Sequence, residues 1–423
     1  MTTDVDTTAP AFLRDKYAII GIGETEYTRG SGVTTRKLAT WAIRNAMEDA
    51  GIGPGEIDGM MSYSGNDSTP SPPVAADLGI RLNFYTDILG GGSSIENLVG
   101  LAIGAIEAGM CKTVVLYRAM NGFTEVRIGG TGARAAAPLA GDRLHNAAYG
   151  WFSAGQNFSQ TFMRAMHDYN LTPEQLAHVK VAHSRHASQN PKAYYKNRMS
   201  VDDVLNSRMI VKPLHLLDCC VETDNGTAII VTSAERAYDY KNTPARVLGV
   251  VGRCCKPGND ITLHYQYGPV SRVAAYYAKD IIWPNSGHGP EEMDLTGSYD
   301  AFTFTTALQL QDYGFCPPGE IGGYISDGTI QLGGARPNNT SGGHLCEVYT
   351  HGMNMVIENV RQLRGTVDDY CPVDADGVRQ HTYDYETPGP TEGACRQKQD
   401  VNLTANLGWA YPAAASALVM RKG

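Results

Sequence analysis

The chain has 423 residues, of which 35 are basic and 44 acidic, and its formal net charge is −9. Hydrophobic residues make up 42% and charged residues 19% of the sequence, which is typical of a globular protein and excludes a disordered one. The length allows a large buried core divided between more than one unit. No basic stripe is present, so we expect no nucleic-acid partner. No apolar run reaches about 18 residues, so we expect no membrane span.

Cysteine usage indicates a reducing compartment. The sequence holds nine cysteines, an odd number, and no basic and then apolar leader typical of a secreted protein precedes them. We therefore expect reduced thiols and a cytoplasmic location. The adjacent pairs Cys219-Cys220 and Cys254-Cys255 lack the two-residue gap of a zinc site, so we predict no metal.

The N-terminal part alternates predicted strands and helices. Short apolar runs predict buried strands near residues 17–21, 57–61 and 113–117. Apolar residues at helical spacing predict helices over residues 35–50, ended by Gly51, and 93–108. This alternation is typical of an α/β fold with a largely buried sheet.

The pattern changes near residue 121. Residues 126–150 are rich in Gly, Ala and Arg and only weakly periodic. Helices are predicted over residues 158–169 and from Thr172, where Thr172 and Gln175 form a capping box. We interpret residues 126–225 as an inserted loop domain that lies over the sheet.

The second half repeats the alternation of strands and helices seen in the first. Strands are predicted at 227–232 and 247–251, and helices at 270–282, 299–311 and 351–364. We therefore predict an N-terminal half over residues 1–125, completed by a strand and helix within 226–244. A C-terminal half follows over residues 245–423, with an acidic, aperiodic insertion at 366–400.

Five sequence blocks resemble, in order, those of sterol-carrier-type thiolases. They are Gly21-Ile-Gly-Glu-Thr-Glu-Tyr27, His183-Ser-Arg-His-Ala-Ser-Gln-Asn-Pro191, Asp224-Asn-Gly-Thr-Ala228, Asn338-Asn-Thr-Ser-Gly-Gly343 and Gln362-Leu-Arg-Gly365. The resemblance implies an α/β thiolase fold with five layers, αβαβα, built from two similar halves and a loop domain. It also implies that the protein is a dimer, as this family usually is.

The residues that carry thiolase chemistry are replaced in this chain. The family's nucleophilic cysteine, at the start of a central helix, corresponds to Gly92, so no acyl-enzyme can form there. Two family positions occupied by histidine or asparagine correspond to Tyr299 and Tyr349. The second family cysteine is absent near Gly408, where the chain reads Asn406-Leu-Gly-Trp409.

A thiolase changed in this way is similar to the bacterial aldolases that shorten steroid side chains. That resemblance implies retro-aldol cleavage of a β-hydroxyacyl-CoA steroid, which yields a ring ketone and propionyl-CoA. It implies that CoA enters as part of the substrate and that no separate cofactor is needed. It also implies a homodimer core bound to a partner protein with an OB-fold domain, and hence a heterotetramer.

Retro-aldol chemistry would give the two tyrosines a role. A free phenol has a pKa of about 10, so it is a poor base at neutral pH but a serviceable acid toward an alkoxide or an enolate. We predict that Tyr299 and Tyr349 divide the proton transfers, and the sequence leaves open which one takes the hydroxyl proton.

Other residues are expected to bind or orient the substrate. Donors to the enolate oxygen and positioning groups are expected at Gly92, Ser93, His344 and Gly408. Supporting roles are expected for His351 and for Asp300, which we also expect to cap the helix after Tyr299.

Contacts to the CoA phosphates are expected from Arg127, Arg134 and Lys192 in the loop domain. Two alternatives stay open from the sequence. The chain could be a non-catalytic thiolase-like subunit that binds an acyl-CoA or a lipid, or a thiolase that uses the relocated thiol of Cys346.

Overall fold

The computed structural model describes residues 13–64, 68–125, 144, 148–151, 153–255, 271–367, 396–410 and 414–423. Most of residues 126–150 and of the insertion at 366–400 therefore lies outside the described residues, as do Arg127 and Arg134. Within the described part, no helix is long and apolar enough to cross a membrane.

Among the described residues, nine strands form one mixed sheet in the order β3-β2-β4-β7-β1-β8-β11-β10-β9. The strands are β1 (Tyr17–Glu24), β2 (Gly59–Tyr63), β3 (Phe84–Ile88), β4 (Thr113–Asn121), β7 (Asp224–Ser233), β8 (Ala245–Cys255), β9 (Leu295–Ser298), β10 (Leu403–Ala410) and β11 (Ala414–Lys422). The first five in sequence form one half of the sheet and the last four form the other. The halves meet where β1 pairs with β8 over only three residue pairs.

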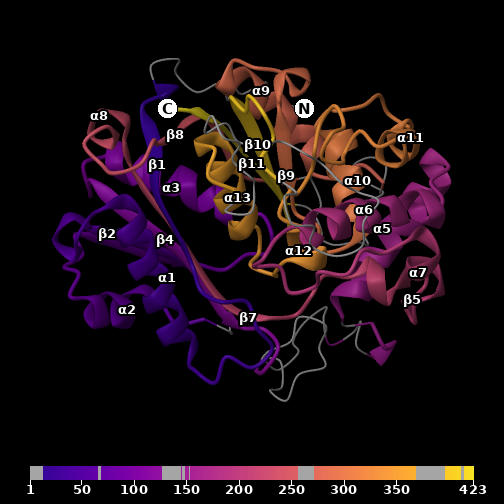
Figure 1. Cartoon of the computed structure of the whole chain (residues 1–423), viewed down its shortest axis with the longest axis horizontal. Coiled ribbons are helices and arrows are strands. Elements are labelled where there is room, and N and C mark those ends of the chain that lie inside the picture. Colours follow the sequence, from indigo (N-terminus) through magenta and orange to yellow (C-terminus); the bar gives the residue numbers. More distant parts are fainter. Residues whose placement is uncertain are drawn as a thin grey trace, which may run out of the picture.

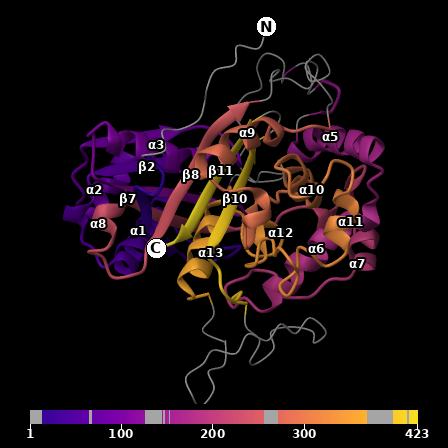
Figure 2. The ribbon, with the colours of Figure 1, turned by 90° about the horizontal axis from the view of Figure 1, so that it is seen from above.

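Helices cover both faces of each half (Figures 1 and 2). The N-terminal helices are α1 (Thr35–Ala50), α2 (Ser71–Leu78), α3 (Ile95–Glu107) and α8 (Ala234–Ala237). The C-terminal helices are α9 (Ala275–Ser286), α10 (Thr303–Asp312), α11 (Ile321–Ser326), α12 (Gly343–Cys346) and α13 (Met353–Arg364). Between the two sets come α5 (Ala154–Tyr169), α6 (Pro173–Ser188), α7 (Val201–Asn206) and the hairpin of β5 (Met209–Val211) and β6 (Leu214–His215).

The hydrophobic clusters define five layers. On β1, Ala18 and Ile20 face α1, whereas Tyr17 and Ile19 face the cluster that contains α3 and α13. Because successive side chains of a strand point to opposite faces, one strand contributes to two clusters. A third cluster packs the other face of the C-terminal strands against α9 and α10. The layers are thus α1, the N-terminal half-sheet, α3 with α13, the C-terminal half-sheet, and α9 with α10. The expected thiolase architecture is confirmed.

Capping residues fix several helix ends as predicted. The Thr34 side chain accepts from the Lys37 amide at the start of α1, and Gly51 ends that helix in the left-handed region. The predicted capping box at α6 is present, since Thr172 and Gln175 each accept the other's backbone N–H. The predicted end of α1 at Gly51 and the predicted start of α6 are confirmed.

The helix predicted from residue 299 begins later, at Thr303. The Tyr299 amide donates to Leu407 O at 2.8 Å, so the ladder between β9 and β10 continues through this residue. Asp300 does not cap the following helix, contrary to our expectation. Its carboxylate accepts from the amides of His344 and Leu345 at the start of α12, at 2.8 and 3.3 Å.

Candidate active site

The two tyrosines singled out in the sequence meet in the interior. Tyr299 directly follows β9, and Tyr349 lies in the loop between α12 and α13. These two helices are labelled near the centre of Figure 1. Their Oη atoms are 2.6 Å apart, and the two residues are 5% and 2% exposed. The fold therefore joins two hydroxyls from distant segments in one short hydrogen bond.

Gly92 lies directly against the ring of Tyr299. A Cβ atom at position 92 would stand 2.1, 2.2 and 2.4 Å from three ring atoms of Tyr299, far inside van der Waals contact. The phenol thus fills the space that a nucleophilic side chain at position 92 would need. Ser93, the next residue, is fully buried, and its hydroxyl has no hydrogen-bond partner among the described residues.

Asp300 joins the tyrosine loops to α6. One carboxylate oxygen lies 2.9 Å from His183 Nδ1 of α6, and the other lies 3.3 Å from His344 Nδ1. The second nitrogen of His344 accepts the Gly352 amide at 3.0 Å, so the ring proton is on Nδ1. That nitrogen lies near the Asp300 carboxyl group but has no hydrogen-bond partner among the described residues. The centroid of the His344 ring lies 5.1 Å from the ring centroid of Tyr299 and 4.7 Å from that of Tyr349.

His351 supports Tyr349 from the other side. The two rings meet edge to face at 4.6 Å, and His351 Nδ1 accepts from the Nε of Arg118, a fully buried residue of β4, at 3.3 Å. The backbone of His351 has φ of +60°, a conformation that an L-residue rarely adopts without a structural reason. This turn brings Tyr349 and His351 to neighbouring positions.

Burial keeps the rings of this site neutral. It raises the pKa of Tyr299, an effect that the hydrogen bond from Tyr349 partly offsets, and it raises the pKa of Tyr349 well above the ordinary value. Burial also lowers the pKa of His344 to about 4 and that of His351 well below its ordinary value. Since an uncharged phenol can still exchange protons with a neighbour, the pair is suited to proton relay rather than to a permanently ionised base.

Thiols near the site are held protonated. Cys346 is fully buried, and burial raises the pKa of its thiol. Cys220, which no sequence motif marked as a site residue, lies close enough to both phenols to influence their pKa values, and its amide donates to Ala301 O at 2.9 Å. Burial raises the pKa of Cys220 well above its ordinary value too, so neither cysteine is a thiolate.

A buried carboxyl group that the sequence did not mark also lies next to the site. Glu96, in the first turn of α3, is 2% exposed and accepts from Ser416 Oγ at 2.7 Å. Gly408 is opposite Ser416 in the ladder between β10 and β11 and makes room for this carboxyl group. A Cβ atom at position 408 would stand 2.4 Å from Glu96 Oε2 and 2.7 Å from Gly92 O. In the sequence, Glu96 stands out only as an acidic residue next to the apolar stripe of a predicted helix.

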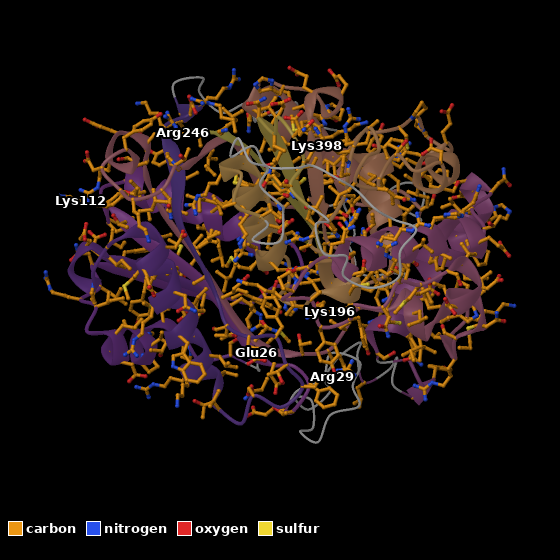
Figure 3. The ribbon with its side chains drawn as sticks, viewed as in Figure 1. Glu26, Arg29, Lys112, Lys196, Arg246 and Lys398 are labelled. Carbon is orange, nitrogen blue, oxygen red and sulfur yellow. The ribbon has the colours of Figure 1, made fainter. Side chains whose placement is uncertain are left out.

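Lys192 lies apart from the tyrosine pair, in a surface pocket of about 680 Å³. Its Nζ pairs with Glu24, and Glu26, Tyr194 and Lys196 also line the pocket. Figure 3 shows Glu26 and Lys196 on the same side of the molecule as Arg29, whose guanidinium lies 4.8 Å from the ring of Tyr194. Within the described ranges, no group of three or more His, Cys, Asp or Glu residues could hold a metal ion.

Comparison with known proteins identifies the family. Residues 269–378 match the family described as thiolase C-terminal domain-like. The chain is 37% identical to the 17-hydroxy-3-oxo-4-pregnene-20-carboxyl-CoA lyase of Mycobacterium tuberculosis, over 84% of this chain and 93% of that protein. It is 36% identical to the steroid side-chain-cleaving aldolase of Thermomonospora curvata, over 82% and 90%.

Solved structures agree with this relationship. The structure titled Ltp2-ChsH2(DUF35) aldolase superposes with a TM-score of 0.83 at 31% identity, over 97% of this chain and 98% of that one. Human mitochondrial 3-ketoacyl-CoA thiolase, at 12% identity and a TM-score of 0.65, shares the fold. The resemblance found in the sequence is confirmed: the chain belongs to the steroid side-chain-cleaving aldolases of the thiolase superfamily.

Proposed function

We propose that this enzyme cleaves the side chain of a β-hydroxyacyl-CoA steroid by a retro-aldol reaction. The bond between the α and β carbons breaks, the β carbon becomes a ring ketone, and the thioester leaves as an enolate that is protonated to propionyl-CoA. The observation that carries the proposal is the phenol pair packed against Gly92, within a chain that matches two steroid side-chain lyases over most of its length.

The reaction balances its own protons. The β-hydroxyl group loses one proton and the α carbon gains one, so no net base is consumed. In our proposal one phenol accepts the hydroxyl proton while it passes its own proton across the 2.6 Å hydrogen bond to the other, which protonates the α carbon. This relay needs neither tyrosine to be ionised at rest, in keeping with the raised pKa values of both.

The enolate oxygen requires stabilisation by donors. We propose that backbone N–H groups at Gly92 and Ser93, just before helix α3, supply it, because the positive end of the helix dipole favours negative charge there. Gly408 lies beside them, as the contact of its missing Cβ with Gly92 O indicates. His344 is proposed to position both phenols through its ring.

We also propose a homodimer bound to an OB-fold partner, with a cytoplasmic location in keeping with six free cysteines among the described residues. The similar structure whose title pairs Ltp2 with ChsH2(DUF35) supports the partner. For the dimer, β3 ends the sheet, and Tyr85 on it and Leu89 just after it are 54% and 70% exposed. An edge strand flanked by exposed apolar residues suits pairing with a second copy.

A product assay tests the proposed function. The protein, alone and with a DUF35-type partner, is incubated with a 17-hydroxy steroid whose side chain ends in a CoA thioester, and the ring ketone and propionyl-CoA are measured. The Tyr299→Phe/Tyr349→Phe double variant serves as the control with matched packing. Equal release of ketone and propionyl-CoA by the wild type supports the lyase. Binding without release would instead support an acyl-CoA carrier, and a trapped acyl-enzyme would support a thiolase.

A further inference from the structure

Glu96 is a buried acid without a cationic partner in the described part of the chain. Its carboxyl group accepts from Ser416 Oγ at 2.7 Å, and none of the salt bridges between described residues involves it. Other buried glutamates of this protein, Glu24 and Glu358, do pair with arginine. Burying an ionised carboxylate without a partner costs folding free energy. Such a group therefore either stays protonated or has a functional role.

Glycines surround this carboxyl group on the side of the active site. Position 408 has no side chain where Glu96 Oε2 lies, and a Cβ atom there would be 2.4 Å from that oxygen. A Cβ atom at Gly352 would lie 3.8 Å from the other oxygen, Oε1. Gly352 follows the Tyr349 loop and donates to His344. The carboxyl group therefore fills a space between the backbone beside Tyr299 and the backbone beside Tyr349.

We propose that Glu96 is a positioning residue of the lyase reaction that acts in its neutral, protonated form. The neutral group holds the start of α3 against β10 and β11 across Gly408, beside the amides proposed to bind the enolate oxygen. An ionised Glu96 would place a second negative charge near the developing enolate. This role rests on the proposed function.

The titratable and charged groups on the elements around Glu96 are compatible with a proton on it. Tyr313, at the end of α10, donates to Ser416 O at 2.9 Å, and nearby Glu96 contributes to the raised pKa of this phenol. The Tyr349 loop contributes His351, whose pKa is lowered by burial. From β8, the Arg253 side chain donates to Leu89 O at 3.0 Å. Burial raises the pKa of Glu96 and the Ser416 hydrogen bond offsets part of that rise, so that the resulting pKa is about 7.

The pH dependence of turnover tests this role. In the complete assembly with the steroid thioester, wild-type kcat should fall at least ~10-fold between about pH 6 and pH 9, because a charge within about 10 Å of the enolate opposes it. Glu96→Gln, which keeps a neutral group of similar shape, should retain its pH 6 rate across this range. Ser416→Ala removes a donor that favours the ionised form of Glu96. In this variant the midpoint of the fall in kcat should therefore move to higher pH.

Glu347→Gln is the matched control. Glu347 is also buried, with a pKa raised to about 7, but its carboxylate accepts from Asn190 and Asn354, each at 2.9 Å, and from Ser341. This variant should keep the wild-type midpoint. If Glu96→Gln keeps the wild-type midpoint, or if wild-type turnover rises with pH while Glu96→Gln is inactive throughout, the proposal is overturned. Absence of ketone release from the wild type would overturn the proposed function and this role together.

Discussion

Substitution of Gly92 by alanine tests the contact on which the site is built. The new Cβ atom would lie 2.1–2.4 Å from three ring atoms of Tyr299, and ordinary contact begins at 3.4 Å. The ring would therefore have to move by about 1 Å or more, away from a hydroxyl that is hydrogen-bonded to Tyr349. A misplacement of about 1 Å costs ~100-fold in rate, and overpacking a core costs about 1–3 kcal/mol.

We therefore expect Gly92→Ala to lower turnover ~100-fold or more and to lower the free energy of unfolding by about 1–3 kcal/mol. Ketone release and urea unfolding measure the two effects. Gly104→Ala in α3 is the control, since a Cβ atom there would meet nothing within 4 Å, and this variant should gain about 0.5–1 kcal/mol in stability. In a Tyr299→Ala background, the cost of Gly92→Ala to folding should largely disappear. Near-normal turnover of Gly92→Ala would refute this account of the site.

Four further outcomes are expected. Tyr299→Phe and Tyr349→Phe should each lower turnover at least ~100-fold while circular dichroism stays unchanged, and a normal rate would remove that residue from the relay. Glu96→Gln should raise the melting temperature at pH 8 but not at pH 4. The pKa of Glu96 is about 7 in the folded protein and 4.5 ordinarily, so the wild type loses about 3 kcal/mol of folding stability as the pH rises from 4.5 to 7. Iodoacetamide should leave turnover intact, because buried Cys346 is a protonated thiol; inactivation that Cys346→Ser prevents would contradict this. Leu89→Asp should convert a dimer to a monomer in light scattering, and an unchanged mass would exclude β3 as the interface.

The sequence predicted the elements that have local signals. The helix α1 was predicted to the residue from its apolar spacing and its closing glycine, and the structure adds a Thr34 cap at its start. The five-layered fold followed from the order of several family blocks. The start of α10 was predicted too early, because a strand pairing that is distant in sequence keeps Tyr299 extended. The strand β3 and the four-residue α12 have too little periodicity for a prediction.

The candidate site was predictable where a family block supplied a position. Tyr299, Tyr349 and Gly92 were identified in this way, and the structure brings them into contact. The contact of His183 with Asp300 depends on the docking of α6, which no local pattern encodes, although His183 begins one of the family blocks. Glu96 was missed because its significance comes from the glycine-lined space around it rather than from its neighbours in the sequence.

The carboxylate of Asp300 has a consequence for how this enzyme reaches its working state. His183 comes from α6, more than one hundred residues before Asp300, and His344 comes from α12, which precedes the Tyr349 loop. Both imidazoles converge on one anion, so α6 cannot detach without removing a neighbour from the residue next to Tyr299. Assembly of the phenol pair and docking of α6 should therefore be a single cooperative event, and hydrogen exchange should report one common opening rate for the two segments.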